Sequence, residues 1–135
     1  MLELTPAAHD AMVAHAFRCL PEEACGLLAG DYGGTSAPAF FPCRNEAASA
    51  KLYTVDPRDL LRADREAAAA GLDIVGVMHS HTHTDAFPSP TDIDQAPDPN
   101  WHYVIVSLKY DTPVLRSYRI ADGLITEEPV VVAAA

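Results

Sequence analysis

Two histidines and an aspartate in the segment 79–92 have the residue types and spacing of a metal site. His79 and His81 are two residues apart, so in an extended strand both imidazoles point to the same side and can reach one ion. Pro88 and Pro90 bias the following loop away from helix, which lets Asp92 curl back as a third ligand. Three protein ligands leave a fourth position open for water, as in catalytic zinc sites. The segment therefore predicts a metallohydrolase.

Other residues compete for these positions. His83 continues the spacing of two, but it should lie in the loop, and a fourth protein ligand would close the coordination shell. Periodicity does not choose between Asp92 and three further aspartates, namely Asp85, Asp94 and Asp98. A lone histidine is usually a core or solvated residue, and this is how we interpret His9 and His15.

Hydrolysis at neutral pH also needs a group that takes a proton from water and passes it to the leaving amine. Glu22 and Glu23 enter an apolar strand, where a surface glutamate has little structural purpose. The residues alone do not separate the two glutamates. Both could equally be loop residues that face water.

Together these elements resemble the Mov34/MPN family of JAMM metalloproteases. The family motif places a glutamate before the first strand of the motif, then histidine-x-histidine, serine and aspartate, which here are Glu23, His79-Ser80-His81, Ser89 and Asp92. The resemblance implies that the two histidines and Asp92 bind one Zn²⁺ per chain. Glu23 would be the general acid and base, and Ser89 would donate a hydrogen bond to the tetrahedral oxyanion. Mn²⁺ or Fe²⁺ could use similar ligands, and the family likeness favours zinc.

Several stretches are similar to those of actinobacterial family members that remove a C-terminal cysteine from a ubiquitin-like sulfur carrier. These stretches are PEEACGLLAG, HSHTHTDAFPSPTDI, HYVIVS and RSYRIADGLITEE. The resemblance implies hydrolysis of an amide or isopeptide bond at the Gly-Gly tail of such a carrier, without an acyl-enzyme intermediate. His83, Pro90 and the short loop 107–113 depart from that pattern.

Three rival functions remain open. The same site could serve a broader, deubiquitinase-like isopeptidase or a small-peptide amidase. An MPN binding scaffold with a structural metal is the alternative outside the enzymes, but such a site needs neither a free base nor an open coordination position. A zinc nucleobase deaminase is disfavoured because its HxE and PCxxC pairing is absent from the sequence.

Composition narrows the class of protein further. Apolar residues make up 49% of the 135-residue chain, which predicts one packed domain over 1–135. The net charge of −10 disfavours binding to nucleic acid. Apolar runs are too short to span a membrane, and no signal peptide is seen. Together with three cysteines outside any CxxC pair, this predicts a cytoplasmic protein with reduced thiols. The oligomeric state stays open, a homodimer included.

The periodicity predicts a mixed α/β domain, and the family likeness implies a curved mixed sheet of the cytidine-deaminase type flanked by helices. Thr5-Pro6 and Asp56-Pro57 each predict a helix start, with the helices ending near Pro21 and Ala70. Predicted strands cover 23–30, 39–43, 74–80, 101–108, 114–120 and 124–126. Asp122-Gly123 predicts a two-residue hairpin turn.

Details of the two later helices are also predicted. Leu60, Leu61 and Ala68 mark the inner side of the second long helix, and Thr91 caps a short turn or helix over 92–95. Three arginines lie along the second helix: Arg58, Arg62 and Arg65. They form either a solvated face or a contact for an acidic carrier.

Overall fold

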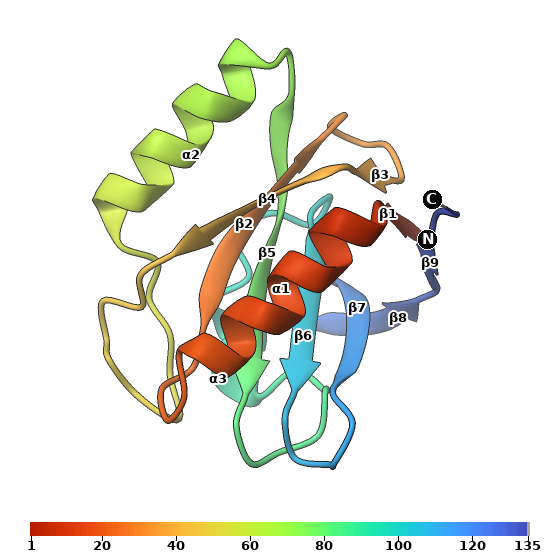
Figure 1. Ribbon diagram of the computed structural model, residues 1–135. Coiled ribbons are helices and arrows are strands. Elements are labelled where there is room, and N and C mark those ends of the chain that lie inside the picture. Colours follow the sequence, from red (N-terminus) through yellow and green to blue (C-terminus); the bar gives the residue numbers. More distant parts are fainter. Residues whose placement is uncertain (135) are drawn as a thin grey trace.

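The computed structural model describes residues 1–134, in which a six-stranded mixed sheet is combined with three helices and a small three-stranded sheet (Figure 1). The elements are β1 (Leu2–Leu4), α1 (Pro6–Arg18), β2 (Cys25–Gly30), β3 (Ser36–Ala37), β4 (Ala39–Cys43), α2 (Pro57–Ala69), β5 (Asp73–His81), α3 (Pro90–Asp94), β6 (His102–Ser107), β7 (Val114–Ala121), β8 (Leu124–Glu128) and β9 (Val130–Val132). The predicted mixed α/β class is confirmed.

The order of strands in the large sheet is β4-β2-β5-β6-β7-β8. Only β5 and β6 run parallel, and every other neighbouring pair in this sheet is antiparallel. Because β2 runs against β5, the first residues of β2 lie beside the last residues of β5, and Cys25 pairs with His79. The segment that carries Glu23 therefore lies next to the two histidines.

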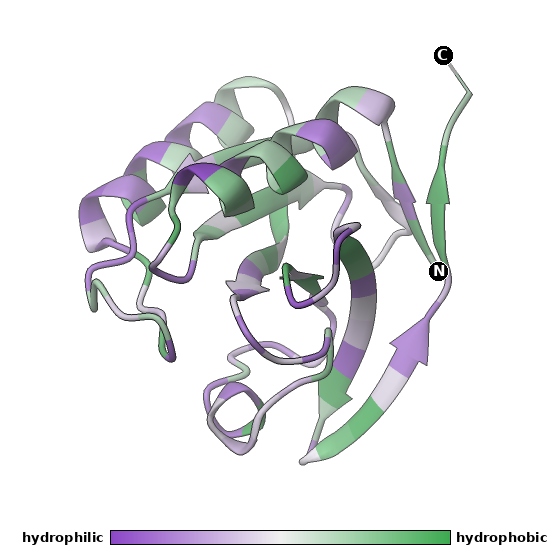
Figure 2. Cartoon of the chain, turned by 60° about the horizontal axis from the view of Figure 1, so that its bottom comes forward, coloured by the Kyte–Doolittle hydropathy of each residue, from purple (hydrophilic) through white to green (hydrophobic). Residues whose placement is uncertain are grey.

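Helices cover both faces of this sheet. On one face Met12 and Ala16 of α1 pack against Met78 and Val104, and on the other face Ala63 of α2 lies in a cluster with Val77 and Tyr103. Successive strand residues alternate between these two clusters, as the period of two requires. Figure 2 shows hydrophobic residues in the central strands, while the helices alternate hydrophobic and hydrophilic positions.

Several sequence-based details are corrected. The predicted inner side of α2, at Leu60, Leu61 and Ala68, is wrong. Leu60 and Leu61 are 42% and 51% exposed and Ala68 is exposed as well, whereas Ala63 and Ala67 are buried. The small alanine side chains let the helix approach the sheet closely. The two leucines lie outside this helix–sheet contact and are exposed. Helix α1 ends at Arg18, before Pro21. Strands β1, β3 and β9 were not predicted, because two or three residues are too few to show alternation.

The hairpin of β7 and β8 is confirmed. Asp122 and Gly123 have φ of 53° and 75°, the left-handed pair that a type I′ turn requires. None of the helices within residues 1–134 is long and apolar enough to span a membrane.

A buried carboxylate at the end of β8, that of Glu128, links this strand to β6 and β7 through hydrogen bonds. Glu128 lies 2.8 Å from both His102 Nδ1 and Ser117 Oγ, and Arg119 Nε donates to it over 3.2 Å. Burial alone would raise the pKa of Glu128, but the hydrogen bonds from His102 and Ser117 outweigh it and lower that pKa to about 2. The ionised carboxylate therefore stabilises the fold.

This network predicts a pH-dependent loss of stability. The folded pKa of Glu128 is below the unfolded value of about 4.3, so its stabilisation is complete above that pH and is lost as pH falls toward 2. Glu128→Gln should lower the free energy of unfolding at pH 7 by about 2–3 kcal/mol and flatten its decline in acid. Urea unfolding at pH 7 and pH 3 measures both.

Glu127→Gln is the matched control. Glu127 pairs with Arg116 at the surface, where both side chains are about half exposed, so its replacement should change stability by less than about 1 kcal/mol. Parallel pH curves for wild type and Glu128→Gln would contradict the proposed role of Glu128.

Candidate active site

Two ring nitrogens and one carboxylate oxygen converge at the C-terminal end of β5. His79 Nε2 lies 3.1 Å from His81 Nε2 and 3.1 Å from Asp92 Oδ2, and His81 Nε2 lies 3.3 Å from the same oxygen. In a tetrahedral zinc site with bonds of about 2.0–2.1 Å, neighbouring ligand atoms are about 3.3 Å apart. The three measured separations fit that spacing, and these residues could hold a metal ion.

The strand and the loop that follows it explain this convergence. His79 and His81 share one side of β5, where they are only 3% and 5% exposed. Asp92 lies in the first turn of α3, with Ser89 as the N-cap. Ser89 Oγ accepts from Asp92 N over 3.1 Å, and Asp92 Oδ2 accepts from Ser89 N over 2.8 Å, which is a capping box. This cap, at Ser89 and not at the predicted Thr91, aims the carboxylate at the histidines.

The protonation states of the cluster suit a cation. His81 Nδ1 donates to the carbonyl oxygen of Asp85 over 2.7 Å. Burial alone would lower the pKa of His81, but its hydrogen bonds to Asp92 and to Asp85 outweigh burial and raise that pKa, so a bound cation would take the place of the proton on Nε2. Burial lowers the pKa of His79 and keeps that ring neutral. Burial alone would raise the pKa of Asp92, but the hydrogen bonds from His79 and His81 outweigh it and lower that pKa. Neutral imidazoles with an ionised carboxylate are the forms that bind metals.

Glu23 lies two residues before the start of β2 and is 5% exposed. It lines a cavity of about 260 Å³ together with His81 and Ser89. Burial raises the pKa of Glu23 to about 7, against the opposing influence of His81. Glu22 is half-buried and does not line this cavity. The arrangement thus offers a carboxyl that can change its protonation state near neutral pH.

Sequence reasoning missed three residues that position this site. Ser80 is fully buried, its Oγ accepts from Ala24 N over 2.7 Å, and its own N donates to Ala24 O over 3.0 Å. Asn45 is buried and donates to the carbonyl oxygen of Glu23 over 3.0 Å. The ring of Tyr53 stacks on His79 with centroids 4.5 Å apart. Only Ser80 carried a signal, since alternation turns it away from the histidines on either side.

The competing candidates lie elsewhere. His83 is exposed and lines the cavity without joining the three-residue cluster. Asp94 is exposed, and Asp98 accepts from the hydroxyl of Tyr32. Asp85 contributes its backbone carbonyl to His81 and not its carboxylate.

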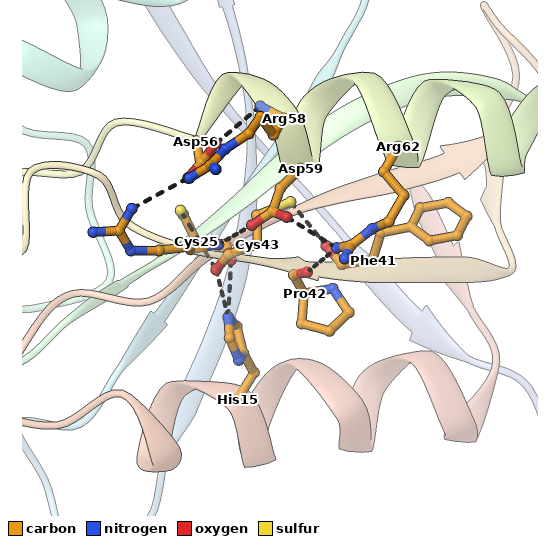
Figure 3. A network of polar contacts seen from close by, with 10 residues as sticks. His15, Cys25, Phe41, Pro42, Cys43, Asp56, Arg58, Asp59 and Arg62 are labelled. Atoms are coloured by element: carbon orange, nitrogen blue, oxygen red, sulfur yellow. Dashed lines mark hydrogen bonds and ion pairs between the residues drawn. The ribbon is translucent and has the colours of Figure 1, made fainter.

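Figure 3 shows the structural role of His15 beneath the first strands. Its Nε2 lies 2.9 Å from the carbonyl oxygen of Cys25 and 3.2 Å from that of Cys43, so this nitrogen carries a proton and donates. Cys25 is fully buried, and burial raises the pKa of its thiol to about 12, which makes it inert. Of the two interpretations offered for His15, core or solvated, the buried core position is the one found.

Two of the three arginines of α2, Arg58 and Arg62, contact neighbouring groups of the chain (Figure 3). Arg58 pairs with Asp56 over 3.4 Å, and Arg62 donates to the carbonyl oxygen of Pro42 over 3.3 Å. Both side chains are more than half exposed. These contacts favour the solvated face over a dedicated contact with an acidic carrier.

The contact between Ser80 and Ala24 leads to a testable expectation. Ser80→Ala leaves the buried N–H of Ala24 without its acceptor, which should lower the free energy of unfolding by about 1–3 kcal/mol. Urea unfolding monitors the change. Ser36→Ala, at an exposed serine of β3, is the control and should shift stability by less than about 0.5 kcal/mol. Equal stabilities of the two variants would contradict the positioning role of Ser80.

Comparison with known proteins agrees with the geometry. Residues 5–121 match the family model described as prokaryotic homologs of the JAB domain. The chain is 45% identical over 122 residues to a CysO-cysteine peptidase of Mycobacterium tuberculosis, covering 90% of this chain and 84% of that protein. It is 36% identical over 111 residues to a desampylase of Haloferax volcanii, covering 78% and 80% of the two chains.

A solved structure extends the likeness to the whole fold. The solution structure of a protein from Desulfitobacterium hafniense superposes with a TM-score of 0.90 at 35% identity, covering 100% of this chain and 94% of that one. Since the family model spans most of the sequence and a close relative covers nine-tenths of it, the chain belongs to the prokaryotic branch of the JAB (JAMM/MPN) family.

Proposed function

We propose that this protein is a zinc peptidase that hydrolyses the bond between the C-terminus of a ubiquitin-like sulfur carrier and a single cysteine. The observation that carries the proposal is the convergence of His79, His81 and Asp92 on one point beside a cavity lined by Glu23. The names of the relatives, a CysO-cysteine peptidase and a desampylase, support a carrier-type substrate.

His79, His81 and Asp92 would hold one Zn²⁺, because two neutral imidazoles and one carboxylate are a common ligand set of catalytic zinc sites. When bound, zinc supplies Lewis acidity and makes water a competent nucleophile at neutral pH. Tyr53, stacked on His79, restricts the rotation of that ring. The hydrogen bond from His81 to Asp85 does the same for the second imidazole.

Glu23 moves the proton in this proposal. Its carboxylate takes a proton from the attacking water and delivers it to the nitrogen of the leaving amine as the C–N bond breaks. The hydroxyl of the water remains on the carrier's carbonyl carbon, which becomes a carboxylate. A pKa of about 7 suits both directions of transfer.

Ser89 stabilises the developing oxyanion in this proposal. Its Oγ already accepts a hydrogen bond from Asp92 N, so the hydroxyl proton is free to be donated. A donor aimed at the tetrahedral oxygen is worth about 3 kcal/mol of barrier. Ser89 thus serves both the metal ligand and the substrate.

The proposal also includes a partner, a carrier protein with a Gly-Gly tail, and a cytoplasmic location. A carrier tail that ends in Gly-Gly is thin enough to reach two histidines that are almost fully buried. We place the protein in the cytoplasm because its three cysteines lie outside any CxxC pair, which fits reduced thiols. We take 1–135 to act as one domain.

Mass spectrometry tests the reaction. Mycobacterial CysO extended by one C-terminal cysteine should lose the mass of that cysteine when incubated with the zinc-loaded protein. A chelator should stop the loss, because removing the cation removes the Lewis acid, and added Zn²⁺ should restore it. An unchanged carrier mass would refute the proposed substrate, while cleavage of isopeptide-linked conjugates alone would favour the broader isopeptidase.

Glu23→Gln separates an enzyme from a binding scaffold. The amide keeps the shape of the side chain but cannot exchange a proton, so kcat should fall by about 10²- to 10⁴-fold while zinc stoichiometry stays unchanged. Glu22→Gln is the matched control and should keep near-normal turnover, since Glu22 does not line the cavity of His81 and Ser89. Full turnover by Glu23→Gln would remove that residue from the mechanism.

A further inference from the structure

We propose that Lys51 binds the α-carboxylate of the departing amino acid, so that the enzyme releases one free C-terminal residue in preference to separating two proteins. The inference rests on the proposed function and specifies its leaving group. It is carried by the cavity beside the metal cluster and by the one lysine that lines it.

The cavity is lined by three parts of the chain. From the loop before α2 come Ala50 and Lys51, and from the end of β5 and the loop after it come His81, Thr82, His83, Thr84 and Ser89, while Glu23 completes the lining. Its volume of about 260 Å³ holds about eight or nine water-sized groups at about 30 Å³ each. This is the scale of one free amino acid.

The position of Glu23 decides which half of the substrate this cavity receives. A general acid must lie within hydrogen-bond reach of the nitrogen that it protonates. The atoms attached to the departing nitrogen therefore lie on the side of the site that Glu23 lines. A C-terminal residue carries its carboxylate two bonds from that nitrogen, so a cation at the same cavity is well placed to bind it.

Lys51 is a cation without a competing partner. The chain holds nine lysines and arginines against 19 acidic residues. Six of the nine form ion pairs within residues 1–134: Arg44, Arg58, Arg62, Lys109, Arg116 and Arg119. In that part of the chain Lys51 forms no ion pair and is exposed, so its ammonium is available to a ligand.

Hydrogen bonds hold the backbone of Lys51 beside the reacting groups. Ser49 Oγ accepts from Lys51 N over 3.0 Å, and the carbonyl oxygen of Ser49 accepts from Glu23 N over 2.7 Å. On the other side, Thr82 Oγ1 donates to the carbonyl oxygen of Ala50 over 3.2 Å. The loop is thus fastened both to Glu23 and to Thr82, the residue after His81, and the cavity is formed before substrate arrives.

A substrate pair isolates the carboxylate. CysO extended by one cysteine is prepared as the free acid and as the C-terminal carboxamide, and kcat/KM is measured for both with the zinc-loaded protein. Wild type should prefer the acid on the order of 10- to 100-fold, the effect of a hydrogen bond to a charged group. Lys51→Ala should lose this preference by turning over the acid more slowly and the amide at the wild-type rate. Lys51→Arg should keep most of it.

Arg65→Ala is the charge-matched control, because Arg65 is exposed on α2 and lies outside the cavity. Arg65→Ala should still prefer the free acid over the carboxamide. That result would exclude an effect of net charge alone, because both variants remove one positive charge. Equal turnover of acid and amide by wild type, or equal losses on both substrates in Lys51→Ala, would overturn the role of Lys51 and leave the peptidase activity standing. Failure of wild type to cleave either substrate would refute the proposed function itself.

Discussion

The antiparallel contact between the start of β2 and the end of β5 is the constraint on which the site depends. Ala24 and Ser80 exchange two hydrogen bonds there, through the backbone of Ala24 and through both the backbone and the hydroxyl of Ser80. Every buried N–H and C=O needs a partner, so this contact cannot shift by one residue without leaving polar groups unpaired. Glu23 is held next to the two histidines as a result.

The three proposed metal ligands are not held in place equally firmly. His79 and His81 belong to a strand that is paired on both sides, within the core of the sheet. Asp92 belongs to α3, a helix of five residues with no buried member. A helix this short has little stability of its own. The capping box with Ser89 therefore sets the position of the carboxylate, and one serine links local folding to the chemistry of the site.

Burial sets the charges of the site as much as proximity does. The protein is acidic overall, yet the neutral imidazole of His79 and the half-neutral carboxyl of Glu23 lie within one buried site. Removing Glu23 from water favours its protonated form, and the same loss of water makes each remaining interaction stronger. The proposed role of Lys51 adds a positive charge to the lining of this cavity, in a protein whose net charge is negative. A small anionic group of the substrate can reach that charge.

The sequence by itself determined the fold class, the long helices, the hairpin and the pair of histidines that face one side of a strand, because these follow from local rules. Capping residues, alternation and the spacing of His79 and His81 act over a few positions and are readable without a structure. The choice of Glu23 over Glu22, and of Asp92 over the other aspartates, needed the family resemblance, since periodicity treats them alike. The structure places those two residues at the site.

Tertiary structure alone decided what surrounds the site. The stacking of Tyr53 on His79, the hydrogen bond from Asn45 to Glu23 and the place of Lys51 in the cavity lining each join segments that are far apart in the chain. Helix α2 buries alanines where its leucines were expected, because the closeness of its approach is set by the sheet beneath it. Such contacts depend on how elements pack against one another, and no short-range pattern in the sequence encodes them.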